Sequence, residues 1–296
     1  TQKLGSEFQK LGLVTSAQWL DYDQDGWQDL AVTGEWMNVQ VFKNKSGKGF
    51  SEVTESLGLE NTMGWWFSLK AEDIDNDGDV DLIAGNLGDN YKYKATADAT
   101  FVGFLNDFDG NRTNEIVLSY YNEGEQYPVR GRECSSQQMP SIKKKFKNYD
   151  AFSKATLVDV YEEEKLENSI HYTVSSFKSA IFLNENGKFK RQDLPIKAQI
   201  APVNQILVSD FDQDGTKDIV LAGNLYASEV ETPRADAGHG TFLKGMENGN
   251  FEVLGPKQSG LFIDGDVKDL AFITVKGQRY ILVAKNNDFL GVVGLN

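Results

Sequence analysis

The sequence predicts an all-β protein, a β-propeller of six or seven four-stranded blades with a partly helical insertion near residues 122–168. Two observations support this prediction. An acidic loop pattern recurs four times, and each copy runs into an apolar, β-prone segment, as at residues 30–34. One repeat can also be followed strand by strand through about 40 residues, which is the size of a propeller blade.

The repeated loop places side-chain oxygens at positions 1, 3, 5 and 9, a glycine at position 6 and a backbone carbonyl at position 7. Such a loop can wrap a hard cation such as calcium, which takes about six to eight oxygen ligands. Carboxylates this close repel one another unless a cation lies among them. The predicted ligands, position 7 included, form loops 1 to 4 in chain order: Asp21, Asp23, Asp25, Trp27 and Asp29; Asp73, Asp75, Asp77, Asp79 and Asp81; Asp107, Asp109, Asn111, Thr113 and Glu115; Asp210, Asp212, Asp214, Thr216 and Asp218.

An EF-hand would also use an acidic loop, but it requires a bidentate glutamate at position 12. No residue at that position can bind a metal through its side chain: the four are Val32, Ala84, Leu118 and Leu221. The sequence therefore favours strand–loop–strand units that hold three to four calcium ions.

Loop 3 departs from the pattern, because its glycine, Gly110, stands at position 4 and Arg112 takes position 6. We expect this loop to be weaker or differently shaped. A degenerate copy at residues 264–269 lacks partners at positions 1 and 3, and we expect no metal there.

The repeats predict the blade boundaries. Loops 3 and 4 are 103 residues apart, nearly twice the 52 between loops 1 and 2, so a metal-free repeat should lie between them. Residues 5–9 resemble an outer strand and could close the ring by completing the last blade, which would remove sheet edges. The blades of one propeller domain are placed near residues 16–58, 66–104, 105–154, 155–194, 204–255 and 264–296.

The insertion interrupts the β pattern. Ser141 could cap a helix in which Ile142, Phe146, Tyr149 and Phe152 make one apolar stripe. Such a stripe is more typical of a helix packed on its own protein than of a partner-binding helix.

Composition limits the classes of function. The net charge is −14, and loops 1 to 4 hold 16 acidic side chains, so much of the acidity belongs to metal sites and argues against nucleic-acid binding. No apolar run approaches the roughly 18 residues of a membrane span.

The chain lacks an initiator Met and a signal peptide, so we expect a mature chain or a piece of a longer one. Cys134 is the only cysteine, which excludes an internal disulfide.

The loop pattern resembles the FG-GAP/VCBS repeat of integrin α-subunit propellers and bacterial surface propellers. Segments after the loops strengthen the resemblance to bacterial VCBS-repeat proteins related to the ASPIC/UnbV group: GEW at 34–36, GWW at 64–66, and GNL at 85–87 and 223–225. The resemblance implies a propeller with calcium between the first and second strand of a blade. It also implies export to the cell surface or the extracellular space, and it names no ligand.

Blade topology separates two faces. Strands alternate in direction, so the metal loops share one face and the connections between second and third strands share the other. Aromatic rings beside carboxylates on that second face could bind a glycan or a protein, although aromatics of this kind also pack between blades. The ligand candidates are Glu35, Trp36, Trp65, Trp66, Tyr91, Tyr226, Arg234, Asp236 and His239.

Three functions remain open at this point. The first is a non-catalytic, calcium-binding module of a secreted or cell-surface protein, with a role such as adhesion. The second is a purely structural domain of a larger surface protein. The third is a propeller glycosidase or lyase, for which Glu35, Asp236 and His239 would be the best acid–base set. The oligomeric state is left open.

Overall fold

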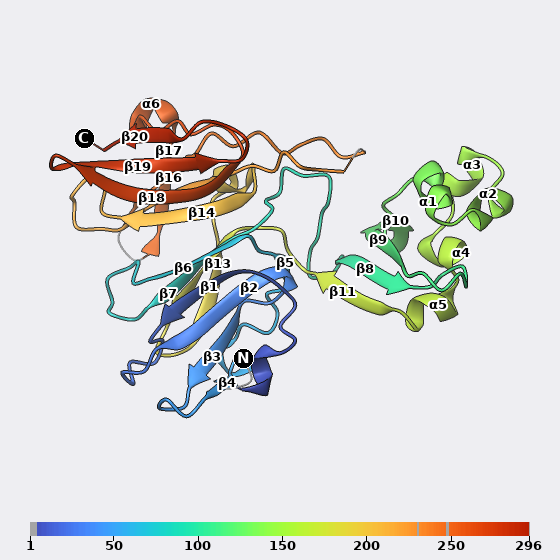
Figure 1. Ribbon diagram of the computed structural model, residues 1–296, viewed down its shortest axis with the longest axis horizontal. Coiled ribbons are helices and arrows are strands. Elements are labelled where there is room, and N and C mark those ends of the chain that lie inside the picture. Colours follow the sequence, from blue (N-terminus) through green and yellow to red (C-terminus); the bar gives the residue numbers. More distant parts are fainter. Residues whose placement is uncertain (1–4, 230, 247–248, 296) are drawn as a thin grey trace. The chain divides into compact units, whose positions relative to one another are not determined.

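The computed structural model describes residues 5–229, 231–246 and 249–295, and their regular structure is mainly β-strand in several antiparallel sheets (Figure 1). The predicted all-β class is confirmed. The chain divides into two compact units, one made of residues 1–92 and 177–296 and the other of residues 93–176. Whether the two form one domain stays a prediction.

The first sheet of the first unit agrees with the blade expected at 16–58. Its strands pair in chain order, with a short fifth strand beside the second: β1 (Leu13–Leu20), β2 (Asp29–Met37), β3 (Gln40–Asn44), β4 (Phe50–Glu52) and β5 (Gly64–Trp65). The 3₁₀ helix η2 (Glu55–Leu57) follows β4.

The second sheet is assembled from two distant parts of the chain. Its order is β13, β12, β7, β6, with bounds β6 (Ser68–Glu72), β7 (Asp81–Gly85), β12 (Ala180–Asn184) and β13 (Phe189–Asp193). The contiguous blades predicted at 66–104, 105–154 and 155–194 are therefore wrong. The strands β12 and β13 pair with each other, and β12 also pairs with β7, so they complete the sheet begun by β6 and β7.

The third sheet agrees with the blade expected at 204–255, and the last sheet has three strands. Their bounds are β14 (Val203–Ser209), β15 (Asp218–Gly223), β16 (Thr241–Gly245), β17 (Phe251–Leu254), β18 (Val267–Val275), β19 (Gln278–Lys285) and β20 (Gly291–Gly294). Short helices η3 (Ile196–Gln199) and α6 (Pro256–Ser259) precede β14 and β18.

The expected closing strand at residues 5–9 is wrong. Within the part of the chain that the structure describes, no further strand joins β18–β20. Ser6–Phe8 instead form the 3₁₀ helix η1. The Phe8 ring packs against Phe42 and Phe50 of the first sheet, with ring centroids 4.9 and 5.4 Å apart, so it is partly buried without a strand.

The first strands of the four sheets lie in a row: β6 lies beside β1 and β14, and β14 lies beside β18. Strand alternation fills the core on both sides of the middle sheets, because neighbouring residues point to opposite faces. In β7, Leu82 packs toward the first sheet and Ile83 toward the third. In β15, Ile219 faces the second sheet and Val220 the last. This packing places loops 1, 2 and 4 side by side.

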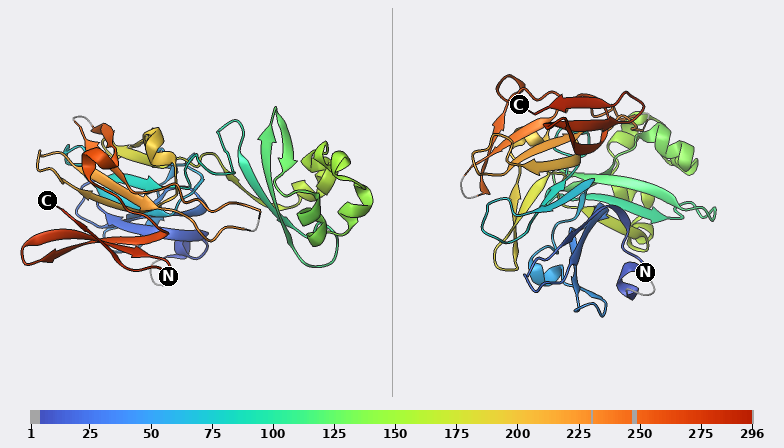
Figure 2. Two further views of the ribbon diagram at one scale, coloured as in Figure 1. Left: turned by 90° about the horizontal axis from the view of Figure 1, so that it is seen from above. Right: turned by 60° about the vertical axis from the view of Figure 1, so that its left-hand side comes forward.

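The second unit has its own sheet and core. The sheet order is β10, β9, β8, β11, with bounds β8 (Phe101–Asn106), β9 (Glu115–Asn122), β10 (Glu125–Pro128) and β11 (Ile170–Val174). Five short helices gather on one side of it (Figure 2): α1 (Arg132–Gln138), α2 (Ser141–Lys145), α3 (Tyr149–Ser153), α4 (Leu157–Tyr161) and α5 (Glu163–Glu167). Among the described helices of the whole chain, none has the length and apolar character to cross a membrane.

The single helix predicted from Ser141 is wrong, because the chain breaks at Phe146 into α2 and α3. Ile142, Phe146 and Phe152 are buried as expected, whereas Tyr149 is 62% exposed. Ser141 makes no cap; the side chain of Asn148 instead accepts a hydrogen bond from Ala151 N at the start of α3.

Candidate metal centres

The structure brings together the carboxylates at positions 1, 3 and 9 of every loop. In each loop, one oxygen from each of these residues lies within 4.8 Å of the others. The four groups are Asp21, Asp23 and Asp29; Asp73, Asp75 and Asp81; Asp107, Asp109 and Glu115; Asp210, Asp212 and Asp218. Three convergent carboxylates form the kind of oxygen cluster that hard divalent cations prefer.

Backbone conformation explains the convergence. Positions 4 and 6 both have positive φ in all four loops, at 56° and 84° in loop 1, 60° and 97° in loop 2, 76° and 70° in loop 3, and 60° and 93° in loop 4. Gly110 and Arg112 therefore occupy the same two left-handed positions as the residues of the other loops. The expectation of a different shape for loop 3 is wrong, because the glycine has moved between two positions that both favour it.

The position 5 side chain stabilises the turn rather than joining the carboxylate cluster. Its oxygen accepts a hydrogen bond from the backbone N–H of position 7, over 3.0 Å in loop 1 (Asp25 to Trp27) and 2.8 Å in loop 2 (Asp77 to Asp79). The same bond joins Asn111 to Thr113 over 2.7 Å and Asp214 to Thr216 over 2.9 Å.

The position 9 carboxylate ties the loop to the rest of its sheet. Asp81 is buried; it accepts hydrogen bonds from Ile74 N at 2.9 Å and from Asn184 N, at the end of β12, at 2.8 Å. Asp218 makes the same pair of bonds to Phe211 N and Gly245 N, and Asp29 bonds Tyr22 N and Asn44 N. This structural role was not evident from the loop pattern, because the second donor lies on a distant strand.

Burial next to other carboxylates changes the acidity of these groups. Loss of solvation raises the pKa of Asp29 to about 6 and that of Asp81 to about 7, and it also raises the pKa of Asp218. A buried carboxylate with a raised pKa gains from a neighbouring cation, which favours its charged form.

Two buried oxygens indicate that the loops fit a cation. Asp23 Oδ1 and Asp73 Oδ1 are buried, and neither has a hydrogen-bond partner. A buried polar atom without a partner costs about 1–3 kcal/mol, and a bound metal ion would remove that cost. The carboxylate and carbonyl oxygens around them match calcium or magnesium better than softer metals.

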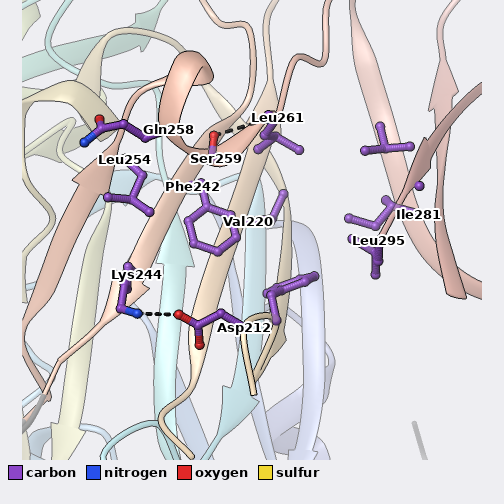
Figure 3. Close-up of a pocket in the computed structure, with 14 residues that line it drawn as sticks. Asp212, Val220, Phe242, Lys244, Leu254, Gln258, Ser259, Leu261, Ile281 and Leu295 are labelled. Atoms are coloured by element: carbon purple, nitrogen blue, oxygen red, sulfur yellow. Dashed lines mark hydrogen bonds and ion pairs between the residues drawn. The ribbon is translucent and has the colours of Figure 1, made fainter. Parts of the chain in front are cut away.

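Lysines enter two of the loops. Lys43 Nζ contacts Asp23 Oδ2 and lies 3.1 Å from Asp25 Oδ2. Lys244 Nζ contacts Asp212 Oδ2, as Figure 3 shows, and lies 3.0 Å from the equivalent Asp214 Oδ2. These carboxylates raise the pKa of both lysines.

Position 4 connects neighbouring loops in the first unit. Gln24 Nε2 donates to Gly78 O at 3.1 Å and to Asp79 Oδ1 at 2.7 Å. Asn76 Nδ2 donates to Gly215 O at 3.2 Å. Loops 1, 2 and 4 thus form a hydrogen-bonded row, whereas in loop 3 position 4 is Gly110, which has no side chain to make this bond.

The degenerate copy at 264–269 is arranged differently. Asp264 pairs with Lys285 at 2.8 Å, and the buried Asp266 pairs with Lys268 at 2.7 Å. The absence of a metal there stays a prediction.

The predicted ligand residues divide into separate groups. Trp36 and Trp65 pack edge to face with centroids 5.2 Å apart, and Glu35 pairs with Trp65 across β2 and β5. Arg234 lies 4.7 Å above the Tyr226 ring and donates to Asp236 at 2.8 Å. His239 stacks on Phe262.

Two of the predicted ligand residues are less accessible. Trp66 is fully buried, donates to Thr62 O at 2.9 Å and packs on Phe182, so it belongs to the core and is not a surface ligand residue. Tyr91 is partly buried, which raises its pKa.

Sequence reasoning missed a cavity of about 420 Å³ between the third and last sheets of the first unit (Figure 3). Its walls are both apolar and polar, with Val220 and Phe242 on one side and Ile281 on the other, and with Asp212 and Lys244 at its border. No local pattern could have indicated it, because its lining comes from strands far apart in the sequence.

Comparison with known protein families gives a match over part of the chain. No curated protein matches the chain. Residues 21–84, which contain loops 1 and 2, match the family described as FG-GAP-like repeat. Residues 21–84 are therefore similar to FG-GAP-like repeats, as the acidic loop pattern predicted.

Proposed function

We propose that this chain is a calcium-binding, non-catalytic β-propeller module of a secreted or cell-surface protein, which binds a glycan or a protein on the face opposite its calcium loops. The observation that carries the proposal is the convergence of three carboxylates in each of four loops with the same backbone shape.

Calcium fits these loops through its chemistry. In each, three carboxylates, the position 5 side chain and the position 7 carbonyl are available as oxygen ligands, within the range of about six to eight that calcium fills together with water. The buried oxygens Asp23 Oδ1 and Asp73 Oδ1 would gain a partner on binding. The ion would stabilise the loops by neutralising carboxylates that otherwise repel one another.

The propeller proposal is supported by the row of four sheets in the first unit, with β1, β6, β14 and β18 adjacent. The outermost sheets of the row expose apolar side chains that further blades would cover, including Leu13 and Trp19 on β1 and Val292 on β20. A ring of six or seven blades would bury these side chains.

The ligand face is supported by topology and by exposed polar and aromatic groups. The end of β2, next to its connection to β3, carries the half-buried Trp36, and the connection between β15 and β16 carries Tyr226, Arg234 and Asp236. Connections of this kind are free of the constraints that fix the metal loops, so they can vary for recognition. FG-GAP repeats commonly occur in extracellular or surface proteins, where calcium is abundant.

Calcium titration tests the proposal directly. Extracellular modules bind calcium with Kd of roughly 10⁻⁴–10⁻³ M. At about tenfold excess over Kd each site adds roughly 1.4 kcal/mol, so four sites add about 5–6 kcal/mol. We expect chelator to lower the melting temperature by many degrees and calcium to restore it. An identical melt in chelator and in millimolar calcium would refute calcium binding.

Ligand binding needs a separate experiment. Calcium-loaded protein should bind members of a glycan array or a panel of extracellular proteins, and chelator should reduce binding only as far as it unfolds the protein. A calcium-loaded protein that binds nothing on either panel would favour a purely structural role. Turnover of a polysaccharide would contradict the non-catalytic assignment.

A further inference from the structure

We propose that Lys43 and Lys244 are internal counter-ions that compete with calcium for loops 1 and 4, so that loop 2 of the same unit, which has no such lysine, binds calcium first. This inference rests on the proposed calcium binding and assigns an order to the sites. It assigns a role to two residues outside the acidic pattern.

The two lysines occupy one structural position. Each stands on the third strand of its sheet, directly before the residue whose backbone N–H donates to the position 9 carboxylate: Asn44 for loop 1 and Gly245 for loop 4. From that position, the lysine side chain reaches the carboxylates at positions 3 and 5. The repeated placement makes an accidental surface ion pair an insufficient explanation.

The second sheet provides an internal comparison. The residue before Asn184, whose N–H donates to Asp81, is Leu183. Among the described residues, no lysine or arginine makes an ion pair with a carboxylate of residues 73–81. Loop 2 also has five acidic side chains, against four each in loops 1 and 4. It therefore combines the highest negative charge with the absence of an internal cation.

The effect on calcium follows from charge and from shared ligands. Asp23 and Asp212 are predicted calcium ligands, and in the structure each contacts a lysine ammonium group. Calcium must displace that ammonium or tolerate a like charge nearby. Because exposed ion pairs are weak, breaking two of them should cost about three- to tenfold in affinity rather than abolish binding.

The lysines should also stabilise the metal-free loops, although they lower the affinity of these loops for calcium. With the ammonium in place, the position 3 and position 5 carboxylates have a partner of opposite charge even without calcium. Loops 1 and 4 then keep their shape at low calcium, whereas loop 2 depends on the ion. The unit would bind calcium in two steps, first at loop 2 and then at loops 1 and 4, whose carboxylates contact a lysine.

Substitution of the lysines tests the inference. In the full chain, Lys43→Met with Lys244→Met keeps the aliphatic stems and removes the charges. The control, Lys45→Met with Lys257→Met, removes the same charge from exposed lysines that make no ion pair with any residue that the structure describes. We expect calorimetric calcium titration to show two sites tightened about three- to tenfold in the first variant and less than about twofold change in the control. In chelator the first variant should melt below wild type.

A reciprocal variant gives an independent result. Leu183→Lys places an ammonium beside loop 2 and should weaken the tightest site by about three- to tenfold. Calcium affinities that are unchanged in both variants, or changed equally by the control, would overturn the inference while leaving calcium binding intact. A wild-type chain that binds no calcium would overturn both proposals.

Discussion

Replacing Asp81 should separate the two roles of the position 9 carboxylate. Asp81→Ala removes a predicted calcium ligand and also leaves two buried backbone donors, Ile74 N and Asn184 N, without their acceptor. Each unpaired buried group costs about 1–3 kcal/mol. The structural loss should therefore be about 2–6 kcal/mol even when no metal is present.

Asp75→Ala is the matched control. Asp75 belongs to the same carboxylate cluster, but its only hydrogen bond in the described structure is a 3.3 Å contact with Asp77 N inside the loop. Its pKa is raised by burial and by Asp77, so the charged form is disfavoured where it stands. Its removal should leave the metal-free stability nearly unchanged.

Thermal unfolding in chelator and in excess calcium measures both effects. For a unit of this size, about 1 kcal/mol corresponds to a shift of about 2–4 °C. In chelator, Asp81→Ala should melt at least about 5 °C below wild type, while Asp75→Ala should stay within about 2 °C. Both variants should lose part of the stabilisation by calcium. Equal melting of the two variants in chelator would refute the structural role assigned to Asp81.

Three further predictions concern acidity, backbone shape and recognition. In the folded chain the pKa values of Asp29 and Asp81 are about 6 and about 7, above the unfolded value of 3.8. The free energy of unfolding of the metal-free chain should therefore fall as pH rises from about 4 to about 7. The contribution of Asp81 to this fall is at most about 4 kcal/mol. Denaturant unfolding in chelator would detect this fall, and saturating calcium should suppress it; a metal-free stability that rises across this window would contradict it. Arg112→Gly should stabilise loop 3 by about 0.5–1 kcal/mol by relieving its left-handed backbone, and Gly110→Ala should do the reverse, both measured as hydrogen-exchange protection across β8 and β9. Trp36→Ala with Tyr226→Ala should weaken binding of the ligand found on the panels but leave calcium-dependent melting nearly intact, whereas a loss of binding that only follows loss of fold would show that these rings are packing residues.

The local part of the fold was predictable because its signals are local. The turn residues and alternating strands predicted the first sheet and the third sheet, and the acidic spacing predicted which carboxylates converge. The strands β12 and β13 lie between loops 3 and 4, where a metal-free repeat was expected. In each of these cases the residues that specify the structure lie within one repeat.

The predictions were wrong where contacts between residues far apart in the sequence determine the structure. The pairing of β12 with β7 cannot be inferred from spacing, because an inserted unit lies between the two strands. The shape of loop 3 was misjudged because the pattern shows only one glycine per loop, while the backbone needs two left-handed residues. Trp66 could not be distinguished from the half-buried Trp36 by residue type, since only the packed sheets determine which ring is fully covered.

The divided second sheet has a consequence for the order in which the chain folds. Pairing β7 with β12 closes a loop of the 94 residues between Gly85 and Ala180, at an entropic cost of about 4 kcal/mol. Within the second unit, residues 93–176, which is inserted between these strands, Phe101 pairs with Val174, so the folded insertion holds its own ends together. Only about 20 flexible residues then remain to be closed, which lowers the cost by about 1.4 kcal/mol and would speed that step about tenfold. The insertion would thus fold early and act as a short connector, allowing an antiparallel sheet to form from strands that begin almost a hundred residues apart.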